Sequence, residues 1–134
     1  MFRPMPDSPG SGRPRPSPRS RVVAGLAIAA AGVIVYHGAL AYFFAQDDWS
    51  GLARARGLLP RLNGPWRYLS GQTYFDLMTR TAGLEALPYH AVSLLAHIAC
   101  ALLLYRWLAR RLSRPAALTG AVFFVAHPAL FTAV

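Results

Sequence analysis

Two adjacent carboxylates, Asp47 and Asp48, follow a long uncharged run that ends at Ala45. If a helix ended there, its C-terminus would disfavour nearby carboxylates by roughly 0.3–1 kcal/mol, and mutual repulsion can raise the pKa of one of the pair. A carboxylate with a raised pKa can act as a general base on a hydroxyl, and a pair can hold a divalent metal with substrate phosphate. The alternative is a solvated pair that ends the helix, with Trp49 as an interfacial anchor.

Four histidines lie in or beside apolar segments: His37, His90, His97 and His127. Ionisable groups within membranes are candidates for functional residues. His90 and His97 are seven residues apart, or about 10.5 Å along a helix, which is too far for one metal ion to bind both. We expect His97 to make an interhelix hydrogen bond, as polar side chains commonly do in membranes. His90, at the outer entrance of an apolar segment, is the better candidate for contacting a ligand.

His127 is followed by Pro128, which removes a backbone donor and leaves the carbonyl of Phe124 without its helical partner. In lipid such a carbonyl must be satisfied by neighbouring groups or by a water-lined cavity. The pattern predicts a helix that lines a cavity near the external face. A structural kink is the alternative.

The composition indicates a membrane protein. The chain has 134 residues, of which 54% are hydrophobic and 14% charged. All fourteen basic residues are arginine, and with five acids the net charge is +9. The arginines flank apolar segments and are not interleaved with aromatics on a polar surface, so they indicate membrane topology and no nucleic-acid partner. A lone cysteine, Cys100, excludes an intramolecular disulfide and a cysteine metal site.

Hydropathy predicts an all-α membrane protein with three transmembrane helices, at about residues 22–45, 88–108 and 115–134. The first run has 24 residues. At about 1.5 Å per residue it reaches roughly 36 Å, which exceeds a hydrocarbon core of about 30 Å. A cleaved signal peptide is the alternative, but its apolar region spans only about 7–15 residues. Phe43 also stands where cleavage would need a small residue.

Two further segments complete the predicted organisation. Residues 1–21 are rich in proline, serine and arginine and are expected to form a disordered basic cytoplasmic arm. Residues 46–87 are expected to form a structured extracytoplasmic loop. Within it, residues 71–83 predict a short amphipathic helix with an Asp76–Arg80 pair. This helix lies either on the bilayer surface or packed within the loop.

The arginines also predict the orientation. The arm carries five, and the short segment 106–114 carries four and no acid. Short basic segments stay in the cytoplasm, so Asp47 and Asp48 are expected outside. The chain ends at Val134 without a polar residue after the third span, so we expect a fragment of a longer protein.

Five stretches occur in a characteristic order: QDDW (46–49), WRYLS (66–70), GLEALPYHAVSLLAH (83–97), LYRWLARRLSRPAAL (104–118) and FFVAHPALFTAV (123–134). This order resembles the N-terminal part of the GT-C class of polytopic membrane glycosyltransferases, over about residues 22–134. The most similar branch contains the transmembrane tetratricopeptide-repeat O-mannosyltransferases and their bacterial relatives. Three positions depart from the family pattern: Tyr68 replaces a proline, Ser93 an asparagine and Thr132 a glutamate. The last change weakens the case for a second acidic site.

The resemblance implies an enzyme that takes sugar from a polyprenyl-phosphate carrier and attaches it to a protein, lipid or glycan hydroxyl on the extracytoplasmic side. Asp47 or Asp48 would be the catalytic base or a metal-associated carboxylate, and the pair is implied more firmly than Asp48 alone. Arg67 would bind the carrier phosphate, because a guanidinium matches phosphate oxygens, or is a surface arginine. His90 and His127 are the other candidate substrate-binding residues, and a divalent metal is the candidate cofactor.

Together with the all-arginine usage, the resemblance predicts an integral protein of the bacterial inner (plasma) membrane with a cytoplasmic N-terminus. Eight or more further spans downstream would support the transferase. The alternative is a non-enzymatic multi-span membrane protein, such as an assembly partner or a transporter segment.

Overall fold

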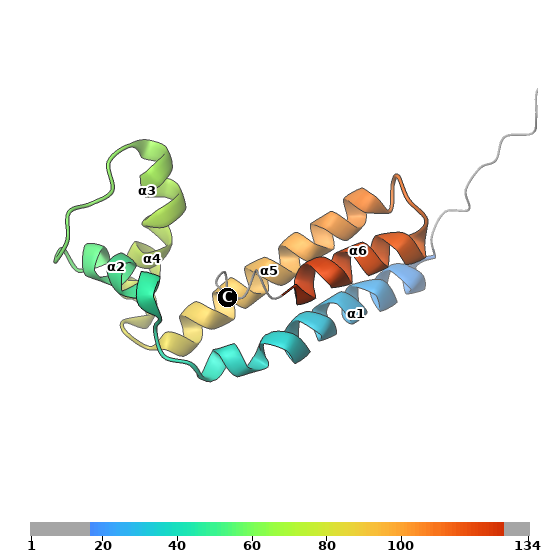
Figure 1. The fold of residues 1–134 in the computed structure, drawn as a ribbon, viewed down its shortest axis with the longest axis horizontal. Helices are drawn as coiled ribbons and strands as arrows, with labels where there is room; N and C mark the ends of the chain where they lie inside the picture. The colour runs from blue at the N-terminus through green and yellow to red at the C-terminus, as the bar shows by residue number, and fades with distance from the viewer. Residues whose placement is uncertain (1–16, 128–134) are drawn as a thin grey trace, which may run out of the picture.

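The computed structural model describes residues 17–127, and every regular element in that range is a helix (Figure 1). The elements are α1 (Pro18–Tyr36), the 3-10 helix η1 (His37–Ala41), α2 (Gln46–Ala55), α3 (Pro65–Gly71), α4 (Thr73–Ala82), α5 (Ala86–Leu108) and α6 (Arg114–Ala126). The all-α prediction is confirmed for this part of the chain. Most of the predicted arm lies outside the described residues, but residues 18–21 belong to α1 and are helical.

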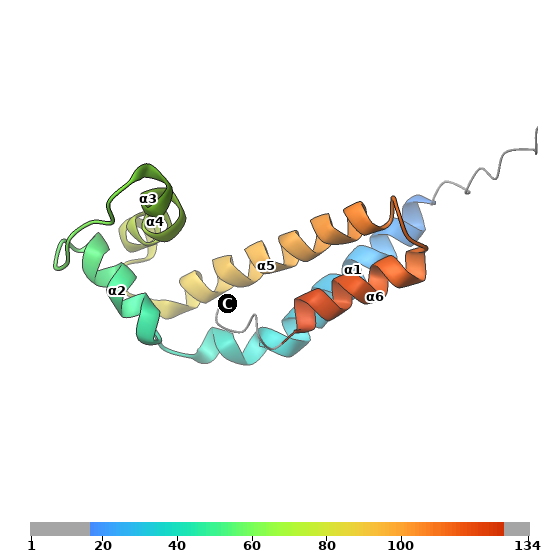
Figure 2. The same ribbon diagram turned by 45° about the horizontal axis from the view of Figure 1, so that its top comes forward.

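The helices form two groups. Figure 1 shows α1, α5 and α6 side by side along the long axis, with α5 antiparallel to the other two. We call this group the bundle. The helices α2, α3 and α4 gather where α1 ends and α5 begins, and we call them the lateral unit. The view in Figure 2 shows the same separation, so the lateral unit lies at the end of the bundle opposite the start of α1.

The first helix differs in its bounds from the predicted span at 22–45. It begins at Pro18, because the side chain of Ser17 accepts a hydrogen bond from Ser20 N at 3.3 Å and proline suits the first helical turn. The α-helix ends at Tyr36, η1 ends at Ala41, and the chain then runs without regular structure to Ala45. The earlier end has a packing cause, since Phe44 is only 7% exposed against the lateral unit.

Within residues 17–127, two helices are long and apolar enough to cross a membrane: the continuous helix Pro18–Ala41, with 24 residues, and α5, with 23. Each reaches about 35 Å or more. Only 28% of the most apolar stretch of each helix is buried inside the fold, whereas the core helix of a soluble protein would be mostly buried. Large apolar side chains therefore face outward, among them Val22, Leu26, Ile34, Leu95 and Leu103. This exposure is what contact with lipid requires.

The predicted third span is wrong for the described residues. Helix α6 has 13 residues, or roughly 20 Å at 1.5 Å per residue, against a hydrocarbon core of about 30 Å. It ends at Ala126, and His127 has extended backbone angles (φ −71°, ψ 123°). A residue before proline is disfavoured in the α-helical region, which explains the end at this point. Residues 128–134 of the predicted span lie outside the described residues.

The end of α6 is held by side chains of the other two bundle helices. The Nε2 of His97 lies 3.2 Å from the carbonyl oxygen of Val125, to which it must donate. The hydroxyl of Tyr36 donates to the carbonyl of His127 at 3.0 Å. The predicted interhelix hydrogen bond of His97 is therefore confirmed. Side chains of the other bundle helices therefore satisfy the carbonyls of Val125 and His127.

Candidate functional site

Asp47 and Asp48 begin a helix and do not end one. Both lie in the first turn of α2, which begins directly after the four residues 42–45 that follow η1. The Oδ2 of Asp48 accepts a hydrogen bond from the backbone N–H of Ala45 at 2.9 Å, which caps the helix. Carboxylates in a first turn are stabilised by the helix dipole by about 0.3–1 kcal/mol. The expectation that the pair opposes the dipole of a preceding helix was wrong.

The two carboxylates differ in their surroundings. Asp48 is half-buried and its side chain holds the start of α2. Asp47 is exposed, and within residues 17–127 its carboxylate accepts no hydrogen bond; Ser50 binds only its backbone carbonyl. Asp47 is therefore the member of the pair that can receive an incoming hydroxyl or cation.

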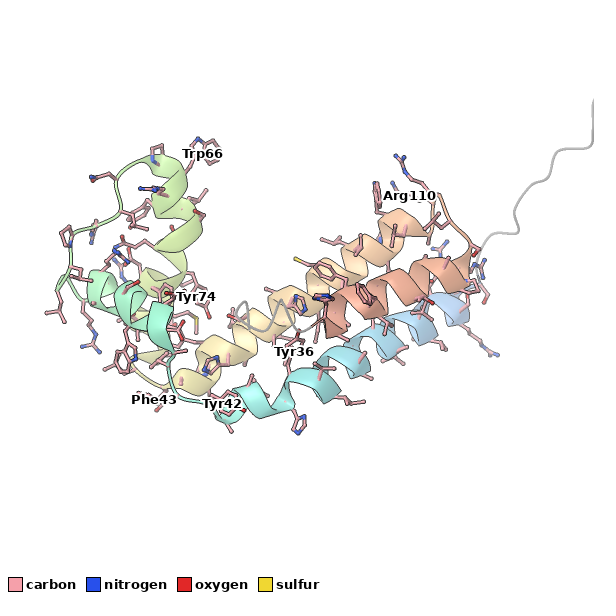
Figure 3. The ribbon with its side chains drawn as sticks, viewed as in Figure 1. Tyr36, Tyr42, Phe43, Trp66, Tyr74 and Arg110 are labelled. Carbon is pink, nitrogen blue, oxygen red and sulfur yellow. The ribbon has the colours of Figure 1, made fainter. Side chains whose placement is uncertain are left out.

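Aromatic side chains join the acidic turn to the rest of the molecule. We define the aromatic junction as the six residues Phe43, Phe44, Trp49, Tyr74, Phe75 and Tyr89. At its centre the rings of Phe44 and Tyr89 meet edge to face, with centroids 5.0 Å apart and planes at 89°. Trp49, one residue after the acid pair, lies 5.9 Å from Phe44. Figure 3 shows Phe43 and Tyr74 where the lateral unit meets the bundle.

The hydroxyls of half-buried Tyr74 and buried Tyr89 fix the aromatic junction. Tyr74 donates to the backbone carbonyl of Tyr89 at 2.7 Å, and Tyr89 donates to the carbonyl of Gly83 at 2.9 Å. Burial raises the pKa of the Tyr74 phenol, and the nearby charge of Asp48 raises it further. The acidic turn therefore lies close to Tyr74. Sequence reasoning did not select these tyrosines, although aromatics clustered on both sides of the acid pair were a usable signal.

The predicted substrate-binding residues lie in three places. His90, at the start of α5, has its ring 6.5 Å from that of Phe44. It therefore borders the aromatic junction, as Asp48 also does. Arg67 is exposed on α3, which packs on α4. His127 ends α6, with its ring 5.1 Å from that of Phe123. The structure brings the acid pair and His90 to one region and leaves Arg67 and His127 on other elements.

The acid pair supplies too few ligands for a metal cage made of protein alone. Within residues 17–127 no three His, Cys, Asp or Glu side chains gather in a group that could hold a metal ion. One oxygen of Asp48 already binds Ala45 N. Magnesium is often held by one or two carboxylates together with water and substrate phosphate, and Asp47 and Asp48 fit only that mode.

A second carboxylate, Asp76, serves the packing of the lateral unit. Its Oδ2 accepts from the Tyr68 hydroxyl at 2.7 Å and its Oδ1 from Gln72 Nε2 at 3.4 Å. Gln72 is fully buried and accepts from the backbone N–H of Leu62 at 3.1 Å. Arg80 attracts Asp76 only at longer range, so the predicted direct pair is not formed. These contacts favour the packed alternative for the helix predicted at 71–83, which is present as α4.

This network should weaken in acid. The hydrogen bond from Tyr68 holds the pKa of Asp76 below its ordinary value of 3.8. A lowered carboxyl pKa adds stability above the ordinary value, and that stability is lost as the pH falls through the folded-state pKa. We expect the Leu62 amide to lose protection from hydrogen–deuterium exchange when the pH is lowered beneath about 3.8.

The matched variants separate this network from general acid unfolding. Asp76→Asn should lower the Leu62 protection at neutral pH and remove its acid dependence. Glu85→Gln, which changes an exposed carboxylate near α4, should behave as the wild type. Equal acid profiles for the wild type and Asp76→Asn would show that Asp76 does not control this contact.

The chain matches no protein-family model, no curated protein and no solved structure. The resemblance to the GT-C class therefore rests on the sequence motifs and stays a prediction.

Proposed function

We propose that the chain is part of a membrane glycosyltransferase that moves a sugar from a polyprenyl-phosphate carrier to an acceptor hydroxyl outside the cytoplasm. The observation that carries this proposal is the exposed carboxylate of Asp47, in the first turn of α2 beside the aromatic junction. Helix α2 lies at the opposite end of the bundle from the start of α1 and the end of α5 (Figure 1), where arginines gather. The proposed chemistry needs the acid pair outside the cytoplasm, and the arginine distribution predicts the same side.

In this mechanism Asp47 accepts the proton of the acceptor hydroxyl as the oxygen attacks the anomeric carbon. The bond from that carbon to the carrier phosphate oxygen breaks, and the phosphate leaves with the electron pair. Asp48 is a positioning residue that caps α2 and fixes the turn. His90 borders the same region. Arg67, on α3, and His127, at the end of α6, stay predicted substrate-binding residues.

The positions of the arginines predict how the chain is oriented in the membrane. Six of them gather at the start of α1, the end of α5 and the start of α6: Arg19, Arg21, Arg106, Arg110, Arg111 and Arg114. Basic residues next to spans favour the cytoplasmic side. We propose a protein of the bacterial plasma membrane with its N-terminus inside and its lateral unit outside.

A transfer assay tests the function. Membranes that contain the intact gene product are given a panel of radiolabelled polyprenyl-phosphate sugars, and membranes from a deletion strain serve as the control. We expect a labelled acceptor only when the gene is present. No gene-dependent product with any sugar of the panel would contradict the proposal and favour the non-enzymatic alternative.

Cysteine labelling tests the orientation. In a Cys100→Ala background, Leu58→Cys in the lateral unit, where Leu58 is 79% exposed, should react with an impermeant maleimide on intact spheroplasts. Arg110→Cys, at the other end of the bundle, should react only after permeabilisation. The reverse pattern would place Asp47 in the cytoplasm, where the proposed donor sugar is absent.

A further inference from the structure

One face of α3 and α4 is left exposed by the packing of the lateral unit. The Gln72 N–H donates to the Tyr68 carbonyl at 3.0 Å and the Gln72 carbonyl accepts from Asp76 N at 2.9 Å, so the helical hydrogen bonds continue from α3 into α4. Residues three or four positions apart therefore lie on one side of both helices. The exposed side chains that recur at this interval are Trp66, Leu69, Thr73, Leu77 and Arg80. We call these five residues the open face.

The opposite side of α4 is packed against the rest of the lateral unit. Phe75 and Met78 belong to the apolar cluster that also contains Phe44 and Leu52. Tyr74 joins α4 to α5 through the hydrogen bond described above. The lateral unit is therefore held together through one side of α4, and the open face stays exposed in the described part of the chain.

Hydroxyl groups on and beside the open face are satisfied within the helix. Ser70 donates to the carbonyl of Trp66 at 2.8 Å. Thr81 donates to the carbonyl of Leu77 at 3.1 Å, and Thr73 donates to a carbonyl of α3 at 3.2 Å. A hydroxyl that already has such a bond can enter an apolar environment without losing a partner. The open face can therefore leave water without leaving these donors unsatisfied.

The position of the open face beside the bundle is suited to contact with lipid. Figure 1 shows α3 and α4 extending sideways from the end of the bundle, on the side of α5. Trp66 is 80% exposed, and Figure 3 shows it projecting from α3 toward the side on which the bundle lies. If α1 and α5 cross a bilayer, lipid occupies that side. Exposed leucines also continue along the chain from the end of α4 into α5, at Leu84, Leu87 and Leu95.

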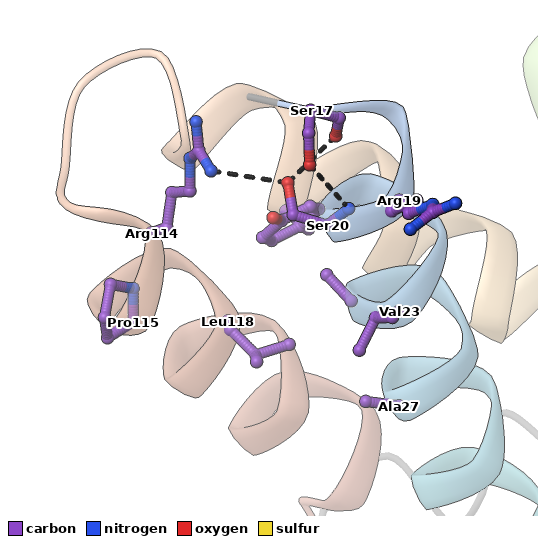
Figure 4. A pocket seen from close by; sticks show the side chains of 10 residues that line it. Ser17, Arg19, Ser20, Val23, Ala27, Arg114, Pro115 and Leu118 are labelled. Carbon is purple, nitrogen blue, oxygen red and sulfur yellow. Dashed lines mark hydrogen bonds between the residues drawn. The ribbon is translucent and has the colours of Figure 1, made fainter. Parts of the chain in front are cut away.

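The other end of the bundle carries the features of a second membrane surface. There Arg114 on α6 donates from Nη1 to Ser20 Oγ on α1 at 3.3 Å (Figure 4). The guanidinium of Arg111 lies over the Trp107 ring, 5.0 Å from its centre. Tryptophan and arginine together are typical of the membrane–water interface, and the open face combines the same two residue types. The two ends of the bundle therefore correspond to the two surfaces of one bilayer.

We propose that the open face lies on the lipid of the leaflet at this end of the bundle, with Trp66, Leu69 and Leu77 among the upper acyl chains. The guanidinium of Arg80 reaches the headgroup phosphates while its apolar stem stays beside the leucines. This contact holds the lateral unit at a fixed depth on the membrane. It requires insertion of the bundle and no sugar transfer, so this proposal and the proposed function can fail independently.

Quenching of Trp66 fluorescence tests the proposal. With Trp49→Phe and Trp107→Phe, Trp66 is the single tryptophan of the chain, which is reconstituted at low density in phosphatidylcholine vesicles. Lipid brominated near the glycerol end of its acyl chains should remove most of the emission, and aqueous acrylamide should remove little. The matched control is Leu58→Trp in a chain whose three native tryptophans are phenylalanine. Leu58 is 79% exposed in the loop between α2 and α3, and its variant should show the reverse pattern.

Spin labels test the same face with all native tryptophans in place. In a Cys100→Ala background, nitroxides attached to Leu69→Cys or Leu77→Cys should be more accessible to oxygen, which concentrates in lipid, than to a water-soluble nickel chelate. The control Arg56→Cys, exposed at the C-cap of α2, should show the opposite preference. These variants replace exposed side chains, so they decide the question if the tryptophan variants do not fold.

Three results would overturn the proposal. Quenching of Trp66 by acrylamide and not by brominated lipid would place the open face in water. Protection from both quenchers would show that another protein segment or a second copy of the chain covers it. Equal lipid quenching at position 58 would show that the whole lateral unit is immersed without a preferred face.

Discussion

Asp47→Asn is expected to lower sugar transfer by about 100-fold to 10,000-fold, which is the contribution of a positioned general base. Asparagine keeps the size and shape of the side chain but cannot accept the hydroxyl proton. The carboxylate of Asp47 is exposed and accepts no hydrogen bond within residues 17–127, so its replacement removes no contact of the fold. Transfer by membranes and the amount of inserted protein, measured on the same samples, provide the readout.

Asp48→Asn is the matched control, because it makes the same chemical change one residue later. The amide oxygen can still accept the hydrogen bond from Ala45 N, so the variant loses mainly the charge next to the helix dipole, about 0.3–1 kcal/mol. We expect transfer to remain within about tenfold of the wild type. If Asp48→Asn abolishes transfer and Asp47→Asn does not, the two roles are reversed. If both variants retain transfer, the acid pair is not catalytic.

The sequence was sufficient for the parts of the fold that depend on local patterns. Apolar runs predict the two long helices, although the first was expected to begin at residue 22 and α1 begins at Pro18. His97 was expected to bond across helices because a polar group in an apolar helix needs a partner, and it does so with Val125. These inferences need no knowledge of distant contacts.

The end of α6 was misjudged because hydropathy counts side chains and not backbone hydrogen bonds. Residues 115–134 read as one apolar run, but the helix stops at Ala126, before His127 and Pro128. Pro128 indicates a break, but the apolar run by itself predicts a continuous span. The residue before a proline disfavours the α-helical conformation, and this rule predicts that α6 ends before His127.

The position of the acid pair at a helix start depends on contacts between residues far apart in the sequence, which local patterns do not show. Whether Asp47 ends one helix or begins another is decided where the chain leaves η1 at Ala41. That exit is fixed by Phe44, which packs on Tyr89, 45 positions further along the chain. Because the apolar run continues to residue 45, hydropathy alone predicts that the helix continues past Ala41.

Gly32→Ala is expected to lower the free energy of unfolding of the bundle by about 1–3 kcal/mol, the usual cost of overpacking a core. Gly32 lies in α1 where the three bundle helices meet. A Cβ atom there would lie 2.9 Å from Ile98 Cγ1 on α5 and 3.1 Å from Val125 Cγ2 on α6. Both neighbours are β-branched and buried, so neither side chain can turn away easily. Unfolding of the purified protein by SDS in mixed micelles, followed by tryptophan fluorescence, measures the change.

Gly25→Ala in the same helix is the matched control. Its added Cβ would meet only Leu102 Cδ2, at 3.8 Å, which is an ordinary contact. Both variants gain the same helix propensity, up to about 1 kcal/mol, so the difference between them isolates the close approach at Gly32. Small residues allow membrane helices to approach closely, and Ala101 and Ala121, both fully buried, continue the same contact on the partner helices. If Gly32→Ala is as stable as Gly25→Ala, the three helices do not pack at this distance, and the hydrogen bonds that Tyr36 and His97 make to the end of α6 lose their geometric basis.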